Sequence, residues 1–315
     1  MARRVPRSFT WDAQSQRDCA RWKLQIESPV VDEFRQFVSG LELTPHVLEN
    51  YTPERATDRM LPECVRLANQ IRGELQSGSG VAWLRGFPVA DFSLIQMKFF
   101  YLVLGAAVGR LMDNYGRLYD VRDYGGDHTT ERIPVSQTHA ATGFHTDSSA
   151  RNTMPDVVAL LCVQPAKKGG ESLVVSGARV HEELRSTDPA ALKTLYRDFI
   201  RDVVTPGAGK SCQALLDNRF PVFSQGLYSP RISFRYMRYW IEKGHARAEL
   251  DLPSEQVDVL DRLDELLESP RLAVQFKLDA GEQLWVNNHV VAHNRTEFVD
   301  DPRSPRHFVR MWIET

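Results

Sequence analysis

The sequence predicts an α+β protein in which helices come first and antiparallel strands come later. Up to about residue 110, apolar residues recur mainly at helical spacing. After about residue 115, short β-type runs are broken by Gly and Pro. Helices followed by antiparallel strands indicate a sandwich or barrel of strands flanked by helices. No boundary divides the chain, so we expect a single domain over residues 1–315, with a mainly helical part over 1–79, a strand-rich core over about 80–315, and an insert around 178–270.

Three helices are expected in the first third of the chain. Ser28 followed by Pro29 predicts the first, because serine is a preferred N-cap and proline a preferred first helical residue. The second begins near Pro62. The third covers residues 94–104, which are so apolar that the helix should be buried, with Ser93 as its cap. The apolar side of the second helix consists of Val65, Ala68, Ile71 and Leu75.

The rest of the chain is expected to form short strands around a helical insert. Runs of apolar and β-branched residues bounded by Gly, Pro and Asn predict these strands. They are residues 81–85, 156–163, 171–176, 283–293 (strand, turn and strand) and 306–313, with a further strand starting near 271. Helices are expected at residues 178–184 and 189–196 and in the segment that Ser254 caps.

Composition and charge exclude several classes of protein. The chain has 315 residues, of which 42% are hydrophobic and 25% charged, as in an ordinary globular protein with a sizeable core. The formal net charge of -2 favours neither a nucleic acid nor a membrane surface as a partner. Four scattered cysteines without a CxxC pair, and a basic start that no apolar segment follows, predict a cytoplasmic protein without a signal peptide.

Two segments far apart in the sequence carry residue types that bind iron. His145 and Asp147 are two positions apart at the end of a predicted strand, and His293 ends another. Because residues two apart on a strand point to the same side, His145 and Asp147 should face one point. Two histidines and one carboxylate form the facial triad that holds non-haem Fe(II) and leaves three positions open. We therefore predict that these three residues are metal ligands and form the catalytic centre.

The last predicted strand places two arginines on one face. Arg306 and Arg310 alternate there with Phe308 and Trp312. Buried cations need an anionic partner, and a guanidinium pairs with a carboxylate through two parallel hydrogen bonds. An arginine shortly after the second histidine is what a site needs to hold the dicarboxylate 2-oxoglutarate, so metal and arginine together predict an oxygenase that consumes it.

At these residues the chain resembles the taurine dioxygenase / clavaminate synthase-like family of Fe(II)- and 2-oxoglutarate-dependent oxygenases. The resemblance covers roughly residues 80–315, and the 148 positions between His145 and His293 fit the long insert of that family. It implies a double-stranded β-helix (a jelly roll, cupin-like) with flanking helices, and Fe(II), 2-oxoglutarate and O2 as cofactors. The motifs that carry it are the strand from Gly80 to Pro88, Phe144-His145-Thr146-Asp147, Pro165 to Ser172 with its Gly-Gly-Glu-Ser turn, and Asn287 to Ile313.

The resemblance also implies roles for individual residues. His145, Asp147 and His293 would bind iron, and Arg306 with Ser172 would hold 2-oxoglutarate. Arg310 occupies the position where some members bind a substrate carboxylate or sulfonate. The carboxylate of Asp147 argues for oxygen transfer, since halogenating relatives lack it.

Further residues are candidates for contact with the substrate. Tyr115 and Tyr119 precede the metal motif, and Phe144 lies within it. A mixed group of bases and aromatics in the insert is interpreted as a pocket wall or a solvated helix face. This group consists of Arg231, Arg235, Tyr236, Arg238, Tyr239 and Trp240. By contrast, His181-Glu182-Glu183 lies on a predicted helix, where residues two apart do not converge on a metal.

The sequence leaves three functions open. The first is a dioxygenase that hydroxylates an unactivated C–H bond of a small anionic or zwitterionic molecule, with release of succinate and CO2. The second uses the same iron centre for desaturation, cyclisation or epoxidation in a biosynthetic pathway. The third is a non-catalytic metal-binding jelly-roll protein. The partner is expected to be a small molecule in each case, and a homo-oligomer is left open.

Overall fold

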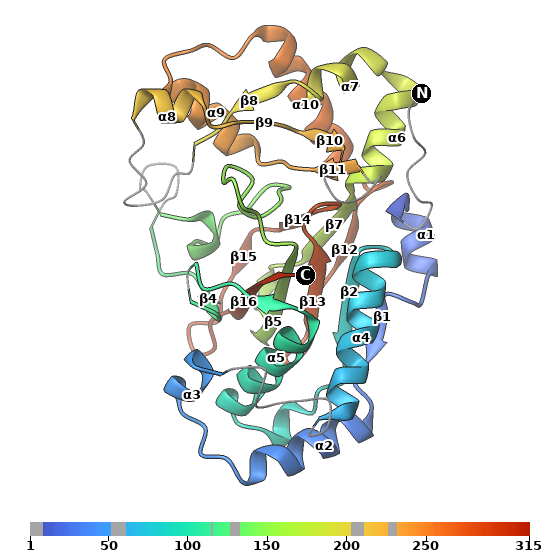
Figure 1. The fold of residues 1–315 in the computed structure, drawn as a ribbon, viewed down its shortest axis with the longest axis vertical. Helices are drawn as coiled ribbons and strands as arrows, with labels where there is room; N and C mark the ends of the chain where they lie inside the picture. Colours follow the sequence, from blue (N-terminus) through green and yellow to red (C-terminus); the bar gives the residue numbers. More distant parts are fainter. Residues whose placement is uncertain (1–8, 52–60, 115, 127–132, 203–210, 226–231) are drawn as a thin grey trace.

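The central element is a seven-stranded sheet that runs through the molecule (Figure 1). The computed structural model describes residues 9–51, 61–114, 116–126, 133–202, 211–225 and 232–315. The strands follow the order β1-β2-β13-β5-β16-β3, and β4 also pairs with β16. Their bounds are β1 Lys23–Gln25, β2 Val81–Arg85, β3 Arg110–Leu111, β4 Tyr119–Val121, β5 Val157–Gln164, β13 Gln283–Asn287 and β16 His307–Glu314.

A smaller antiparallel sheet, ordered β12-β7-β14, carries one of the predicted metal ligands. Its strands are β7 Ser172–Ser176, β12 Val274–Phe276 and β14 Val291–Arg295. Three two-stranded pairs complete the strands of the described segments. They are β6 Lys168–Gly169 with β15 Phe298–Val299, β8 Asp198–Ile200 with β9 Arg219–Pro221, and β10 Phe223–Gln225 with β11 Ile232–Phe234.

Most helices gather in two groups, one in the lower and one in the upper part of the view in Figure 1. The N-terminal group is α2 Ser28–Ser39, α3 Pro45–Glu49, α4 Pro62–Ser77 and α5 Leu94–Val108, whereas α1 Ala13–Asp18 lies apart from it, next to β12. The mid-chain group is α6 Gly177–Thr187, α7 Pro189–Leu195, α8 Cys212–Leu216, α9 Arg238–Arg247 and α10 Ser254–Glu268. Within the described part of the chain, no helix is both long and apolar enough to cross a bilayer.

The large sheet separates two hydrophobic cores because its strands are apolar on both faces. On β16, Val309, Met311 and Ile313 pack with α2, α4 and α5 in one core. Phe308 and Trp312 belong to the other core, which the large sheet shares with the small sheet. The predicted alternation is therefore confirmed from Phe308 to Ile313, and it turns Arg310 toward the space between the two sheets. Arg306 lies just before the strand, and the register of β16 against β5 shifts between His307 and Phe308.

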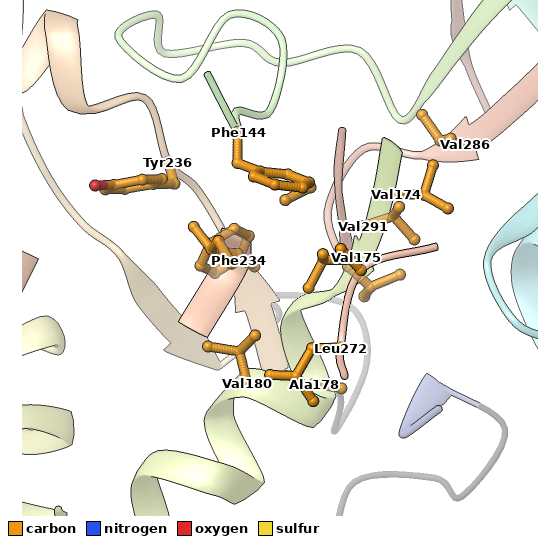
Figure 2. Packing of buried hydrophobic residues seen from close by; sticks show 14 of the residues in the cluster. Phe144, Val174, Val175, Ala178, Val180, Phe234, Tyr236, Leu272, Val286 and Val291 are labelled. Atoms are coloured by element: carbon orange, nitrogen blue, oxygen red, sulfur yellow. The ribbon is translucent and has the colours of Figure 1, made fainter. Parts of the chain in front are cut away.

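Figure 2 shows part of the core between the two sheets. Val174 and Val175 of β7 and Val291 of β14 lie close to Val286 of β13. Phe144 lies over Phe234 in the same cluster, next to the metal motif.

Most predicted elements are confirmed, but three local assignments were wrong. Helix α2 begins at Ser28 itself and Glu27 occupies the N-cap, and α10 likewise begins at Ser254 after Pro253. A proline is tolerated anywhere in the first helical turn, where its missing N–H leaves no bond unmade, so Pro29 did not fix the boundary. Residues 140–147 do not form a strand.

The helix-facing side of the large sheet should contribute strongly to stability. Leu161 of β5 is fully buried there, so Leu161→Ala should lower the free energy of unfolding by roughly 2–5 kcal/mol through lost burial and the cavity left behind. Urea denaturation measures this change. Leu41→Ala is the control, because Leu41 is 42% exposed and its removal should cost less than about 0.5 kcal/mol. Similar losses in both variants would contradict the assignment of this core.

Candidate metal centre

The three predicted ligands converge on one point. The Nε2 atoms of His145 and His293 lie 3.4 and 3.6 Å from Oδ1 of Asp147. The three potential ligand atoms all lie within 4.8 Å of one another. Ligands on a six-coordinate ion at about 2.1 Å lie about 3 Å apart when they meet at right angles, so small movements would close this site on a metal. Within the described segments it is the one such group of three or more His, Cys, Asp or Glu.

Backbone hydrogen bonds bring the ligands together. His145 and His293 bond to each other twice, with N–O distances of 3.0 and 2.9 Å, as an isolated antiparallel bridge. The next amide, of Thr146, donates to the carbonyl of Tyr236. The amide of Asp147 donates to Oδ1 of Asn288 at 2.8 Å. Successive residues thus bond to three different segments. That is why residues 140–147 do not form the predicted strand, although His145 and Asp147 still face one point.

Both histidines turn Nε2 toward Asp147. Nδ1 of His145 donates to the carbonyl of Gly143 at 2.9 Å, which orients the ring so that Nε2 can serve as the metal-binding nitrogen. Burial, together with the nearby His145, lowers the pKa of His293, so the His293 ring stays neutral at neutral pH. Neutral imidazole is the form that binds metal ions.

The two oxygens of the Asp147 carboxylate contact different groups. Oδ1 faces the two histidines, while Oδ2 accepts a 2.6 Å hydrogen bond from the Trp312 indole and lies 3.3 Å from Arg310 Nη1. Burial opposes the charged form, but the nearby Arg310 guanidinium holds the pKa of Asp147 well below its usual range. The carboxylate is therefore ionised and oriented to offer one oxygen to a metal.

Arg306 is a buried cation with unused donors. It is 4% exposed, and its Nε and Nη1 atoms have no hydrogen-bond partner among the described residues. Its guanidinium lies 3.9 Å from the centroid of the Phe308 ring. Burial and the nearby Arg295 lower its pKa to about 9. A buried guanidinium with free donors is what a bound carboxylate would satisfy.

Ser172 lies on the inner face of the small sheet. It pairs with Arg295, and Val174 pairs with His293, so Ser172 and His293 share one face. The Gly-Gly turn before Ser172 adopts positive φ at both Gly169 and Gly170, which favours glycine. A side chain at Gly169 would collide with the carbonyl of Glu297. The turn also lies beside Arg306, whose Nε would be 3.5 Å from a Cβ at Gly170.

A pocket of about 170 Å³ opens beside the metal ligands. Arg310 and Tyr119 line it, as the sequence predicted, and so do Tyr239 and Trp240 from the group interpreted as a pocket wall. Phe144, the third predicted substrate contact, is not among the residues that line this pocket and is buried in the core (Figure 2). Tyr115 lies outside the described residues.

The sequence did not predict two contacts of the centre. Trp312 was assigned only to a strand face, and its hydrogen bond to Asp147 spans 165 positions. Asn288 links the two halves of the site, since its amide nitrogen donates to the carbonyls of Asp147 and Pro155. The available signal for this role was Asn288 itself, a polar residue within the mostly apolar run of residues 283–293. His181 lies on α6, where its Nε2 pairs with the Tyr196 hydroxyl at 2.9 Å.

Fold and site together define the class of non-haem iron oxygenases. Residues 48–312 match the family described as "Taurine catabolism dioxygenase TauD, TfdA family", and the chain belongs to this family. It is accordingly an Fe(II)- and 2-oxoglutarate-dependent dioxygenase, with O2 as co-substrate, as the sequence predicted.

Named relatives support this assignment along nearly the whole chain. The FR-33289 synthase of Streptomyces rubellomurinus is 25% identical over 96% of this chain and 88% of its own length. A uridine-5'-phosphate dioxygenase from a Streptomyces species is 33% identical over 60% of this chain and 65% of its own length.

Solved structures of the same fold include an asparagine oxygenase. It is 18% identical, with a TM-score of 0.71, over 94% of this chain and 93% of that one. The non-haem iron oxygenase OrfP, crystallised with Fe and alpha-ketoglutaric acid, is 14% identical, with a TM-score of 0.65, over 92% of this chain and 93% of that one. At these identities the likeness concerns the fold.

The indole of Trp312 should tune metal binding. Trp312→Phe removes the hydrogen bond to Asp147 but keeps an aromatic ring beside Arg310, whose guanidinium lies 4.6 Å from the ring centroid. Loss of such an orienting partner typically weakens metal binding by about 10–100-fold, which anaerobic titration of the metal-free protein with Fe(II) measures.

The matched control is Trp83→Phe. That indole also donates to a carboxylate, Glu282, at 2.9 Å, but on another part of the large sheet. Its removal should leave the affinity for Fe(II) unchanged. Equal affinities in wild type and Trp312→Phe would refute the assigned role.

Proposed function

We propose that the chain hydroxylates an unactivated C–H bond of a small anionic molecule, with release of succinate and CO2. Fe(II) would be held by His145, Asp147 and His293, which leave three positions open on a six-coordinate ion. The observation that carries the proposal is the convergence of these three residues beside a pocket lined by Arg310.

Arg306 and Ser172 are suited to bind the distal carboxylate of 2-oxoglutarate. Arg306 offers buried donors without partners, and Ser172 offers a hydroxyl on the face that His293 shares. A carboxylate bound in this way would neutralise a guanidinium whose burial is otherwise unfavourable. When bound, iron and 2-oxoglutarate supply the oxidation: one atom of O2 enters succinate as CO2 leaves, and the other enters the substrate.

The protein contributes orientation and a sheltered pocket. Trp312 and Arg310 both hold Oδ2 of Asp147, which keeps Oδ1 for the metal. Aromatic side chains of Tyr239 and Trp240 form part of the pocket wall and restrict water around the reacting C–H bond. Arg310 therefore has two roles: it steadies a metal ligand and presents positive charge to an anionic substrate.

Relatives support a small-molecule substrate. Their names include a uridine-5'-phosphate dioxygenase and a human gamma-butyrobetaine dioxygenase, the latter 25% identical over 65% of this chain and 51% of its own length. Family membership does not fit a non-catalytic binding protein. Desaturation, cyclisation or epoxidation would use the same centre. The mass of the product separates hydroxylation, which adds one oxygen atom, from desaturation and oxidative cyclisation, which remove two hydrogens; an epoxide has the same mass gain as an alcohol and is distinguished by NMR.

We further propose that the two sheets are the two faces of a double-stranded β-helix within one oxygenase domain of residues 1–315. Their shared core and the bridge between His145 and His293 support this. In this arrangement residues 1–79 brace the large sheet, and the segment around 178–270 is an insert that contributes to the pocket wall. The four cysteines are unpaired, which supports a cytoplasmic setting. A homo-oligomer remains a prediction, which sedimentation of the purified protein would test.

Arg306→Ala should mainly weaken 2-oxoglutarate binding. Removing a buried charge partner costs roughly 2–5 kcal/mol, which corresponds to at least about 30-fold in affinity. Anaerobic titration of the Fe(II)-loaded protein with 2-oxoglutarate, followed by the visible charge-transfer band of the complex, measures this shift. His145→Ala should abolish the band.

Arg303→Ala is the control, because Arg303 is exposed three residues away and its loss should leave the titration unchanged. Wild-type affinity in Arg306→Ala would exclude the proposed co-substrate site. A folded, iron-loaded wild type without any band would exclude the proposed centre.

A further inference from the structure

The segment just before the metal motif forms part of the pocket wall. Residues 133–136 and Thr142 line the pocket, and we call residues 133–142 the wall segment. It leads into Gly143, whose carbonyl accepts the hydrogen bond from Nδ1 of His145. The position of the wall segment therefore affects both the shape of the pocket and the setting of a metal ligand.

Arg295 of β14 fastens the wall segment to the small sheet. Its Nη2 donates to the carbonyls of Thr138, at 2.9 Å, and Ala140. Its backbone bonds to Thr142: the amide of Thr142 donates to the carbonyl of Arg295 at 3.2 Å, and the amide of Arg295 donates to Oγ1 of Thr142 at 3.1 Å. Arg295 is 7% exposed, so these bonds are sheltered from water. One buried residue two positions after His293 thus holds the wall segment along much of its length.

Arg295 also lies beside the arginine assigned to the co-substrate. Its guanidinium lies 4.9 Å from the centroid of the Phe298 ring, and that of Arg306 lies 5.1 Å from the same centroid. Two like charges at one ring in the protein interior repel each other. In agreement with this, burial and then the charge of Arg295 are the main causes that lower the pKa of Arg306 to about 9. The energy of Arg295 in its present position therefore depends on the charge of Arg306.

Two carboxylates near this arginine pair reduce the repulsion without removing it. The charges of Asp123 and Asp300 both favour the charged form of Arg295. Asp123 pairs with Nδ1 of His139 at 3.4 Å, and Asp300 accepts the backbone amide of Arg306 at 2.8 Å. Nε of Arg295 and two guanidinium nitrogens of Arg306 have no hydrogen-bond partner among the described residues. An anion that binds Arg306 would therefore change the electrostatic balance of the pair.

We propose that Arg295 is a positioning residue for the substrate pocket, and that binding of 2-oxoglutarate at Arg306 tightens its hold on the wall segment. A carboxylate that pairs with Arg306 neutralises this guanidinium. The repulsion on Arg295 then falls, so the state in which Arg295 binds the wall carbonyls gains population over states in which it has turned away. This inference rests on the function proposed above, because it takes 2-oxoglutarate as the anion at Arg306.

The coupling between the two sites is reciprocal, as linkage requires. A molecule in the pocket that holds Thr142 in place also keeps Arg295 beside Arg306, and the additional positive charge there favours the bound co-substrate carboxylate. The route runs from Arg306 past the Phe298 ring to Arg295 and the wall segment. It is separate from any effect that passes through the iron, so it can be tested without a substrate.

Hydrogen exchange of the wall segment tests the proposal. The Fe(II)-loaded protein is compared without O2, with and without saturating 2-oxoglutarate, and exchange is followed in a peptide that includes residues 138–142. In wild type, 2-oxoglutarate should slow exchange by at least about 5-fold. Arg306→Met keeps a long side chain but removes the charge, so it should show slow exchange without any 2-oxoglutarate. Arg295→Met should exchange fast in both conditions. If Arg306 only stabilised the structure, Arg306→Met would instead exchange faster than wild type.

The control is Arg35→Met on α2, where a guanidinium also lies over an aromatic ring, 5.5 Å from the centroid of Phe92, and it should preserve the response of the wall segment.

A response that survives in Arg295→Met, or exchange in Arg306→Met that is no slower than in wild type without 2-oxoglutarate, would overturn the proposal. Wild type and Arg306→Met decide the question even if Arg295→Met does not fold. The charge-transfer band separates the two levels: a normal band without slower exchange refutes the role of Arg295 alone, whereas no band in wild type refutes the proposed function.

Discussion

The antiparallel bridge between His145 and His293 is the contact on which the site depends. Two backbone hydrogen bonds join residues 148 positions apart, and they place both imidazoles on one side of the small sheet. Since backbone bonds do not depend on the identity of the side chain, the ligand rings inherit their separation from the fold.

The second constraint is the sharing of one carboxylate. Oδ1 of Asp147 faces the two histidines. Oδ2 of Asp147 contacts Trp312 and Arg310. Strand β16 thus links two tasks: its Arg310 and Trp312 orient the metal ligand Asp147, and Arg306 just before it is available for a dicarboxylate. Because Arg310 and Trp312 lie two positions apart on β16 and Arg306 directly precedes it, a change in the register of β16 would disturb both Asp147 and the pocket wall.

Positive charge is the common theme of the pocket and its surroundings. Arg306 and Arg201 are both buried, and buried cations are costly in isolation. A carboxylate bound by Arg306 would offset part of this cost. Arg201 and Arg235 donate hydrogen bonds to the carbonyls of Ser149 and Arg151, in the turn that follows Asp147. A scaffold that is rigid before binding loses less entropy when the substrate arrives.

The sequence alone was enough to predict the three metal-ligand positions, a buried arginine at Arg306 and most strands. These predictions depend on local signals, which are residue types two positions apart and runs of apolar residues. It also placed the buried helix α5, whose Ser93 cap forms with Gln96 as expected. Tertiary structure alone decided that Phe144 belongs to the core, that residues 140–147 bond to three different segments, and that Trp312 reaches Asp147. Each of these depends on contacts between residues more than 80 positions apart, and no local pattern records which distant partner a side chain will meet.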